Sequence, residues 1–205
     1  MTYDNKRTAG LLFFVGSVQF VLAIIVSEAI YSGYSVGQQY VSDLGDWVLA
    51  GNSAAIFNVS IILMGIFVAA GAYFIQRVFN NKLFTSLLVM IAIGGVGVGF
   101  VAENVFLPIH SLFAVVAMLF GVASAFMSYR FEKSPFSYIS VILGTVMLVS
   151  FILFSLGAYV NSDFYLGLGL GGMERFVIYP LLLWLLGFGA YLMNNSSDAP
   201  TTSKT

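Results

Sequence analysis

The segment EAIYSGYSVGQQYVSDLGD, residues 28–46, separates two long apolar stretches with polar, aromatic and acidic residues. Glu28 lies at the end of the first stretch, and Asp43 and Asp46 precede the second. Ionisable residues at the depth of a membrane boundary are candidates for a functional site. We interpret the segment as the floor or lid of a polar site at one face of a membrane.

Composition indicates an integral membrane protein. Of 205 residues, 60% are hydrophobic and only 8% are charged, whereas roughly 25% of a soluble domain is charged. A net charge of −1 without a basic patch predicts no nucleic-acid partner. The chain has no cysteine, which excludes disulfides, thiolate catalysis and cysteine metal sites.

Six apolar segments approach or exceed the roughly 20 helical residues needed to cross a bilayer. They cover residues 9–30, 54–75, 84–101, 109–127, 136–160 and 176–193. Their continuous apolar character lacks the alternation of a membrane β-barrel. The sequence therefore predicts an all-α, polytopic transmembrane bundle of six helices. We expect one domain over residues 1–193 and a polar, disordered tail over 194–205.

Basic residues predict the orientation of the bundle. Six crossings place seven of the eight on one face, with Arg175 alone on the other; the seven are Lys6, Arg7, Arg77, Lys82, Arg130, Lys133 and Lys204. The positive-inside rule then predicts a multi-pass protein of the cytoplasmic (cell) membrane with both termini cytoplasmic. The face that carries Arg175 is predicted to be extracytoplasmic and is called the outer face here.

Two glycine-rich stretches invite interpretation. Gly95 and Gly99 have the small-xxx-small spacing that allows helices to pack closely. The run from Gly167 to Gly172 lacks the Lys-Ser/Thr of a phosphate-binding loop, so we expect a flexible or re-entrant outer loop there.

The candidate site is the group of ionisable residues on the outer face. Glu28 and Glu103 lie at predicted helix C-termini, where the helix dipole disfavours an anion, and Arg175 lies at a predicted N-terminus, where it disfavours a cation. These charges complement one another, so we expect Arg175 to pair with Glu103, Glu28 or Asp43. The whole candidate cluster is Glu28, Ser42, Asp43, Glu103, His110, Glu174 and Arg175.

Three interpretations of this cluster remain open. It is a structural ion-pair clasp without a ligand, a polar pocket that meets a lipid head group or substrate, or a set of solvated boundary charges. Asp43 and Asp46 also have a local interpretation, because Asp43 as an N-cap with Asp46 three residues later approximates a capping box. It would start a short interfacial helix that ends at Gly51.

His110 is the single histidine and follows Glu103 by seven positions. A carboxylate beside an imidazole could orient it as a general base, and a serine partner would come from Ser42 or another helix rather than from Ser111. The plainer interpretation is a hydrogen-bonded residue at a helix end. A catalytic zinc site usually needs more than one imidazole, so we predict no metal and no cofactor.

Several short motifs resemble the DUF998 family of small integral membrane proteins. They are Tyr34 with Ser42-Asp43-Leu44-Gly45, Asn58, the glycine-rich helix that leads to Glu103, His110-Ser111, and Glu174-Arg175 with Tyr179-Pro180 before Trp184. The resemblance covers nearly the whole chain and implies a six-helix fold and little chemistry. The chain is more distantly similar to the Frag1/DRAM/Sfk1 membrane proteins, which implies a scaffold or regulator rather than an enzyme.

We therefore expect a non-catalytic membrane protein whose outer polar site binds a lipid head group or a partner membrane protein. In this hypothesis Arg175 would hold a phosphate or carboxylate, and the acids would position it. The expected partners are membrane lipids, another membrane protein or a second copy of the chain. One alternative is an outer-leaflet hydrolase or transferase that uses His110 with Glu103 or Asp43, and another is a structural subunit of a larger complex.

Overall fold

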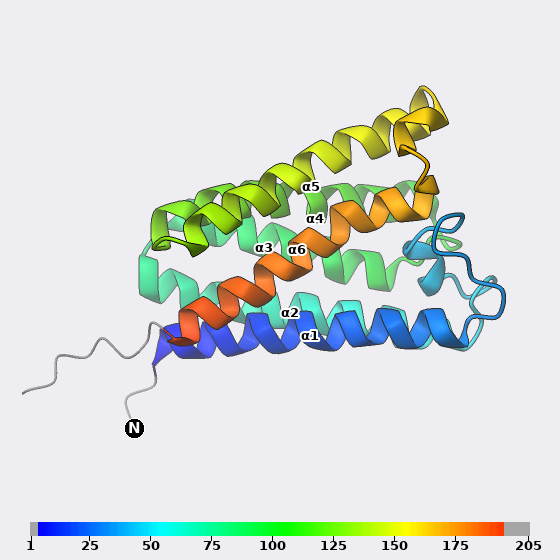
Figure 1. Ribbon diagram of the computed structural model, residues 1–205. Coiled ribbons are helices and arrows are strands. Elements are labelled where there is room, and N and C mark those ends of the chain that lie inside the picture. The colour runs from blue at the N-terminus through cyan, green and yellow to red at the C-terminus, as the bar shows by residue number, and fades with distance from the viewer. Residues whose placement is uncertain (1–3, 195–205) are drawn as a thin grey trace, which may run out of the picture.

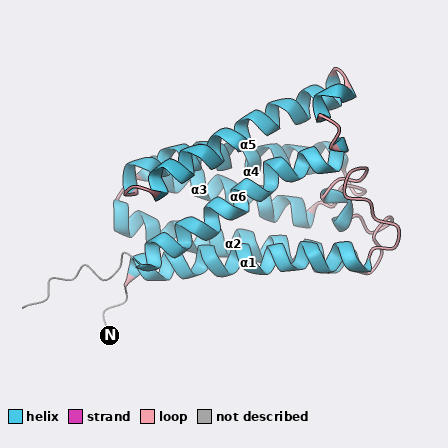
Figure 2. Cartoon of the chain, viewed as in Figure 1, coloured by secondary structure: helices cyan, strands magenta, loops and turns pink. Residues whose placement is uncertain are grey.

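The computed structural model describes residues 4–194 and shows a helical bundle (Figures 1 and 2). The long helices are α1 (Asn5–Ile30), α2 (Ser53–Phe79), α3 (Lys82–Phe100), α4 (Leu107–Ser128), α5 (Phe136–Tyr159) and α6 (Gly169–Asn194). Short 3-10 helices η1 (Ser42–Gly45), η2 (Tyr129–Phe131) and η3 (Ser162–Tyr165) lie in the connections. All six long helices have the length and composition of membrane spans. The predicted all-α polytopic membrane fold is confirmed, while residues 195–205 of the predicted tail, with Lys204, lie outside the described residues.

Local capping fixes the helix ends at the α1 N-terminus and the α2–α3 turn. Asp4 Oδ1 accepts hydrogen bonds from the backbone N–H groups of Lys6 at 3.0 Å and Arg7 at 3.3 Å. Asn81 Oδ1 accepts one from the N–H of Phe84 at 2.9 Å, and the preceding Asn80 adopts a left-handed conformation with φ 47°. These side chains satisfy helix-end groups that would otherwise lack partners. The tight turn makes α2 and α3 antiparallel neighbours.

Neighbouring helices in the chain pack side by side from α1 to α4, and α6 closes the bundle by packing against α1 and α5. Figure 1 shows α6 crossing obliquely between α1 and α5. Helix α5 packs mainly on α4 and α6 and has the smallest buried share of the six spans. It therefore lies at the periphery, where space can open between it and α4.

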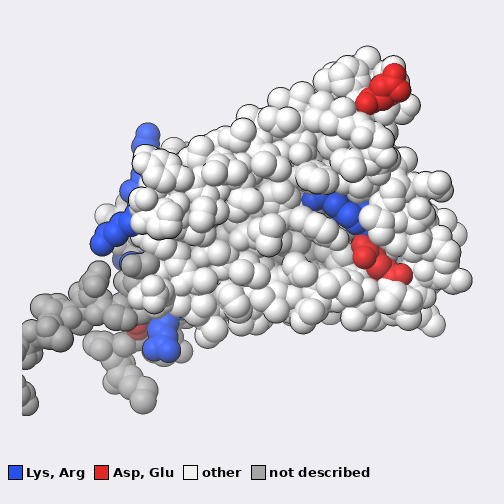
Figure 3. All heavy atoms as spheres, in the orientation of Figure 1, with Lys and Arg blue, Asp and Glu red and all other residues white. Residues whose placement is uncertain are grey.

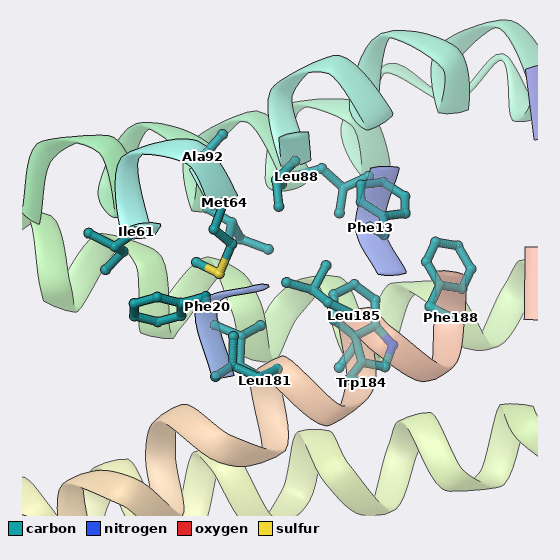
Figure 4. Packing of buried hydrophobic residues seen from close by; sticks show 14 of the residues in the cluster. Phe13, Phe20, Ile61, Met64, Leu88, Ala92, Leu181, Trp184, Leu185 and Phe188 are labelled. Atoms are coloured by element: carbon teal, nitrogen blue, oxygen red, sulfur yellow. The ribbon is translucent and has the colours of Figure 1, made fainter. Parts of the chain in front are cut away.

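Large aromatic side chains fill the core between α1, α3 and α6 (Figure 4). Phe188 lies at the centre, with ring centroids 5.9 Å from Phe13, 5.9 Å from Phe84 and 5.6 Å from Trp184. Trp184 is fully buried and donates from Nε1 to Ser128 Oγ at 3.2 Å. The indole thus buries its large apolar surface and satisfies its one polar atom.

Helix α6 begins at Gly169, so the expectation of a flexible or re-entrant loop over Gly167–Gly172 is wrong for most of that run. These glycines permit a close approach to the α1–α2 connection. The N–H of Gly171 donates to the Gly37 carbonyl at 3.3 Å, and a Cβ on Gly171 would lie 1.8 Å from the carbonyl oxygen of Gln39. Glycine is therefore required by backbone contact rather than by loop flexibility.

The glycines of α3 support close helix packing, as the small-xxx-small pattern predicted. A Cβ on Gly99 would lie 2.7 Å from the Asn58 carbonyl oxygen of α2, and a Cβ on Gly97 would lie 2.2 Å from the Phe113 ring of α4. Gly95 is less constrained, since its nearest neighbour would be a methionine carbon at 3.6 Å. The same helix thus packs closely on both sides.

Charges divide between the two ends of the bundle. On the face in Figure 3, basic side chains gather at one end, and at the other a basic patch lies directly beside an acidic one. Six of the eight described Asp and Glu residues lie at one end, formed by residues 31–52, 101–106, 160–168 and the adjoining helix termini; we call it the acidic end. Among residues 4–194, Arg175 is the one Lys or Arg at that end.

Candidate functional site

Arg175 lies in the second turn of α6 and is held by four hydrogen bonds. Its Nη2 donates to Glu28 Oε1 at 2.5 Å and to the Tyr34 hydroxyl at 2.6 Å. Its Nη1 donates to the carbonyl oxygens of Val36 and Gly171, both at 2.9 Å. The two terminal nitrogens therefore use all four of their hydrogens within the protein. We call Glu28, Tyr34 and Arg175 the clasp.

The clasp joins α1, the α1–α2 connection and α6. Glu28 is the partner of Arg175, one of the three that the sequence left open. The Arg175 side chain is 7% exposed and that of Glu28 is 22% exposed, so solvent screens the pair only in part. Tyr34 adds its ring beneath the guanidinium, 5.5 Å from the ring centroid to Cζ. Burial raises the pKa of the Tyr34 hydroxyl to about 12, so it acts as a neutral donor and acceptor.

The connection between α1 and η1 is fixed by its own side chains. The Tyr34 hydroxyl donates to the carbonyl oxygen of Tyr40, six positions later, at 2.8 Å, which closes a loop. Gln39 spans the same loop, donating to the Tyr31 hydroxyl at 2.8 Å and accepting from the Ser35 N–H at 2.7 Å. The segment that the sequence placed as floor or lid is therefore a structured cap over the ends of α1 and α6.

The side chain of Glu174 points in a different direction from that of its neighbour Arg175, because adjacent helical residues point about 100° apart. One carboxylate oxygen, Oε2, accepts a short hydrogen bond from the backbone N–H of Val41. The other, Oε1, has no hydrogen-bond partner among residues 4–194. Glu174 is only 6% exposed and lines a pocket on the side of α6 that faces α4 and α5.

A hydrogen bond between Ser42 and Glu103 joins η1 to the segment that follows the C-terminus of α3. Ser42 Oγ donates to Glu103 Oε2 at 2.7 Å, which leaves Oε1 of Glu103 without a hydrogen bond in the described part of the chain. Nearby, Asp43 Oδ2 accepts from the backbone N–H of Tyr40 at 2.9 Å. Burial first, and then the charge of Glu103, raise the pKa of Asp43 to about 6.

The expected capping box around Asp43 and Asp46 is replaced by two separate caps. Asp43 lies inside η1 and accepts a hydrogen bond from the backbone N–H of Tyr40, three positions earlier in the chain. Asp46 follows η1 and accepts from the N–H groups of Val48 at 2.6 Å and Leu49 at 2.9 Å. The predicted interfacial helix up to Gly51 is a series of turns instead. The two carboxylates accept hydrogen bonds from backbone N–H groups of different turns, rather than capping one helix together.

His110 opens α4 as predicted and is 4% exposed. Its Nδ1 lies 2.7 Å from the carbonyl oxygen of Val101, which can only accept, so Nδ1 carries the hydrogen. The backbone carbonyl therefore orients the ring, in the position where the sequence suggested Glu103. His110 lines a pocket, and its second ring nitrogen, Nε2, takes no part in the Val101 contact.

Ser42, Glu103, His110 and Glu174 line a pocket of about 340 Å³ between α4 and α5, in the half of the bundle that includes the acidic end. Its polar lining is Tyr40, Ser42, Glu103, His110, Ser111, Ser155, Tyr159 and Glu174, and its apolar lining is Leu107, Ala114, Val115, Met118, Phe151, Phe154 and Ala158. Leu107 and Val115 on α4 and Tyr159 on α5 are exposed, so the pocket opens on the side of the bundle near the acidic end. We call it the α4–α5 pocket.

A second, apolar cavity of about 70 Å³ continues toward the middle of the bundle. Ser42, His110, Ala114, Met118 and Glu174 line both spaces. Phe20, Ile61 and Leu181, shown in Figure 4, line the deeper one. The polar side chains thus lie between a lateral opening and an apolar interior.

The structure divides the predicted cluster in two. Glu28 and Arg175 form the clasp, whereas Ser42, Glu103, His110 and Glu174 line the pocket; Asp43 lies beside the latter group. Sequence reasoning missed the α5 wall, because α5 carries no Asp, Glu, Lys, Arg or His and its Phe151, Phe154 and Ser155 look like ordinary membrane-span residues. It also missed Tyr40, whose ring packs 6.0 Å from that of Phe154.

Within residues 4–194, no group of three or more His, Asp or Glu side chains is placed to hold a metal ion. The pocket's free polar groups are carboxylate oxygens, hydroxyls and one imidazole nitrogen. The site can therefore accept hydrogen bonds from a ligand and stabilise a positive charge.

Comparison with known proteins finds one family. The family described as "Protein of unknown function (DUF998)" matches residues 14–191. No curated protein and no solved structure matches the chain.

Proposed function

We propose that this chain, which belongs to the DUF998 family of membrane proteins, binds the head group of a membrane amphiphile in the α4–α5 pocket. One observation carries the proposal: a pocket with buried polar groups at its inner side opens onto the lipid-facing surface of two membrane helices. Such an arrangement suits a molecule with one polar and one apolar part.

The size of the pocket supports a head group rather than a whole lipid. About 340 Å³ lies at the lower end of the range for small-molecule sites, roughly 300–1,000 Å³. Phe151, Phe154 and Met118 supply walls on which the first part of an alkyl chain can pack. The rest of the chain would lie along α4 and α5 in the bilayer.

Arg175 is not assigned to the ligand in this proposal. All four hydrogens on its terminal nitrogens are used by the clasp, and it does not line the α4–α5 pocket. A phosphate at Arg175 would have to displace Glu28 and Tyr34. We therefore infer that the clasp holds the α1–α2 connection in place, and that this connection in turn supplies Tyr40 and Ser42 to the pocket.

Native mass spectrometry of protein extracted in mild detergent tests the proposal. Ser155→Phe fills the pocket from α5, and its own hydroxyl bonds only to the Phe151 carbonyl of the same helix. Ile152→Phe adds the same ring on the exposed face of the same helix, outside the pocket, and serves as the control. We expect retained amphiphile to be lost in Ser155→Phe and kept in Ile152→Phe. Equal retention in both variants would remove the pocket from consideration.

A second candidate function is an outer-leaflet hydrolase or transferase. It is favoured by one observation, namely that Nε2 of His110 is left free by the Val101 contact while His110, Ser42 and Ser111 line the same pocket. A neutral imidazole can act as a general base toward a bound hydroxyl or water. Turnover of membrane lipid extracts that disappears in His110→Gln, with binding retained, would favour this function over binding alone.

A further inference from the structure

We infer that the head group bound in the α4–α5 pocket carries a primary ammonium. This inference rests on the proposed function and adds the ligand's chemical class. Its basis is the set of groups that the pocket presents, which combines two carboxylates with further hydrogen-bond acceptors and includes no basic side chain apart from the imidazole.

The first step concerns charge. Glu103 and Glu174 both line the pocket, and neither forms an ion pair with a described residue. Arg175 follows Glu174 in the chain, but its salt bridge is to Glu28 on the other side of α6. A cation in the pocket would therefore lie beside two carboxyl groups that have no ion-pair partner among residues 4–194, and its charge would favour their ionised form.

The second step concerns hydrogen bonds. Glu174 is 6% exposed, and within residues 4–194 its carboxylate accepts one hydrogen bond, from the Val41 N–H to Oε2. Glu103 accepts one hydrogen bond, from Ser42 to Oε2, and the Val101 contact of His110 uses only Nδ1 and leaves Nε2 at the pocket. These oxygens border the pocket and can accept further hydrogen bonds, so the site favours a ligand that supplies donors. A primary ammonium supplies three N–H donors.

The third step excludes the other common head-group charges. An anionic group would face two carboxylates with no arginine or lysine in the pocket lining. A quaternary ammonium would satisfy the charge but has no N–H, and it usually needs an aromatic cage. Tyr40, Phe151, Phe154 and Tyr159 line the pocket, so a quaternary group is the sharpest competitor and belongs in the test.

The test compares probes that share one alkyl chain. Purified full-length protein in dodecyl maltoside is titrated with dodecylamine, dodecyltrimethylammonium, dodecanoate and dodecanol, and bound probe is measured by native mass spectrometry. Ethanolamine without an alkyl chain reports whether a free amine suffices. We expect dodecylamine to bind roughly tenfold or more tightly than each of the other probes, since an unpaired buried charge strongly penalises mismatched ligands.

Substitutions of Glu103 and Glu174 test whether these two carboxylates cause the preference for dodecylamine. Glu174→Gln and Glu103→Gln should each reduce dodecylamine affinity roughly tenfold or more while leaving dodecanol unchanged. Asp163→Asn removes one charge from an exposed residue at the same end and should leave the preference intact. If Glu174→Gln does not fold, Glu103→Gln still decides the question, because its carboxylate is only partly buried.

The outcomes separate this inference from the proposed function. Binding of all dodecyl probes with similar affinity, blocked by Ser155→Phe, keeps the pocket and overturns the ammonium assignment. A preference for dodecyltrimethylammonium equal to that for dodecylamine also overturns it. Probe binding that is unaffected by Ser155→Phe refutes the proposed function itself. Tight binding of ethanolamine alone would transfer the assignment to a free amine.

Discussion

The clasp predicts a specific pattern of stability in a double-mutant cycle. Arg175→Met removes the guanidinium and leaves Glu28 largely buried without its partner, and it deprives Tyr34 and two carbonyl oxygens of a donor. Breaking a buried ion pair from one side typically costs about 3–5 kcal/mol of unfolding free energy. Because Glu28 is 22% exposed, we expect the lower end of that range, about 3 kcal/mol.

Glu28→Gln removes the other charge, and the double variant removes both. In the double variant no unpaired charge remains, so it should be at least as stable as Arg175→Met alone, with a coupling free energy of about 2 kcal/mol. Unfolding followed by tryptophan fluorescence in mixed detergent gives the four free energies. Strictly additive effects of the two substitutions would refute the clasp as described.

The remaining predictions concern pH dependence and helix packing. Folding raises the pKa of Asp43 from 3.8 to about 6, so its ionisation costs stability as the pH rises through that range; screening of this half-buried group reduces the nominal cost to about 1 kcal/mol. Asp43→Asn should therefore stabilise the protein near pH 8 but not near pH 4 in the same unfolding assay, and an equal effect at both pH values would contradict this assignment. Burial likewise raises the pKa of Glu132 to about 7, so Glu132→Gln should gain stability above but not well below that pH, and a gain independent of pH would contradict the assignment. Gly99→Ala should destabilise by about 1–3 kcal/mol because its Cβ would meet an α2 carbonyl, whereas Gly95→Ala should be neutral or stabilising; equal effects on thermal unfolding would show that α2 and α3 do not pack as described.

The helices could be predicted from the sequence because bilayer thickness and backbone hydrogen bonding leave little choice. Five of the six predicted segments agree with the observed helices to within a few residues at most. The exception is α6, which begins at Gly169 rather than near Phe176. Glycine usually indicates a break in a helix, and only the backbone contact of Gly171 with Gln39 explains its presence in this one.

Charge complementarity predicted that Arg175 would be paired, but not which acid would pair with it. Glu28, Asp43 and Glu103 all lie at the same end, and distance along the chain does not distinguish them. The choice of Glu28 depends on α6 packing against α1, which apolar periodicity in membrane helices does not encode clearly. His110 is similar, since its Val101 partner is a backbone atom without a sequence signal.

The α4–α5 pocket could not be predicted from the sequence, because the α5 side chains that line it have no feature that distinguishes them from other residues of a membrane span. Ser155 and Phe154 are residue types common in any membrane span, and their role depends on the peripheral position of α5. Glu174 was recognised as a candidate together with Arg175. The two point into different surroundings, a distinction that follows from helix geometry once the neighbouring helices are known.

Photolabelling tests the central claim most directly. The protein is reconstituted in nanodiscs with a trace of amphiphile that carries a diazirine near its head group, irradiated, and digested for peptide mass spectrometry. The α4–α5 pocket predicts labels concentrated within residues 107–118 and 151–159 and lost in Ser155→Phe. Labels spread evenly around the bundle, or concentrated on α2 and α3, would contradict it.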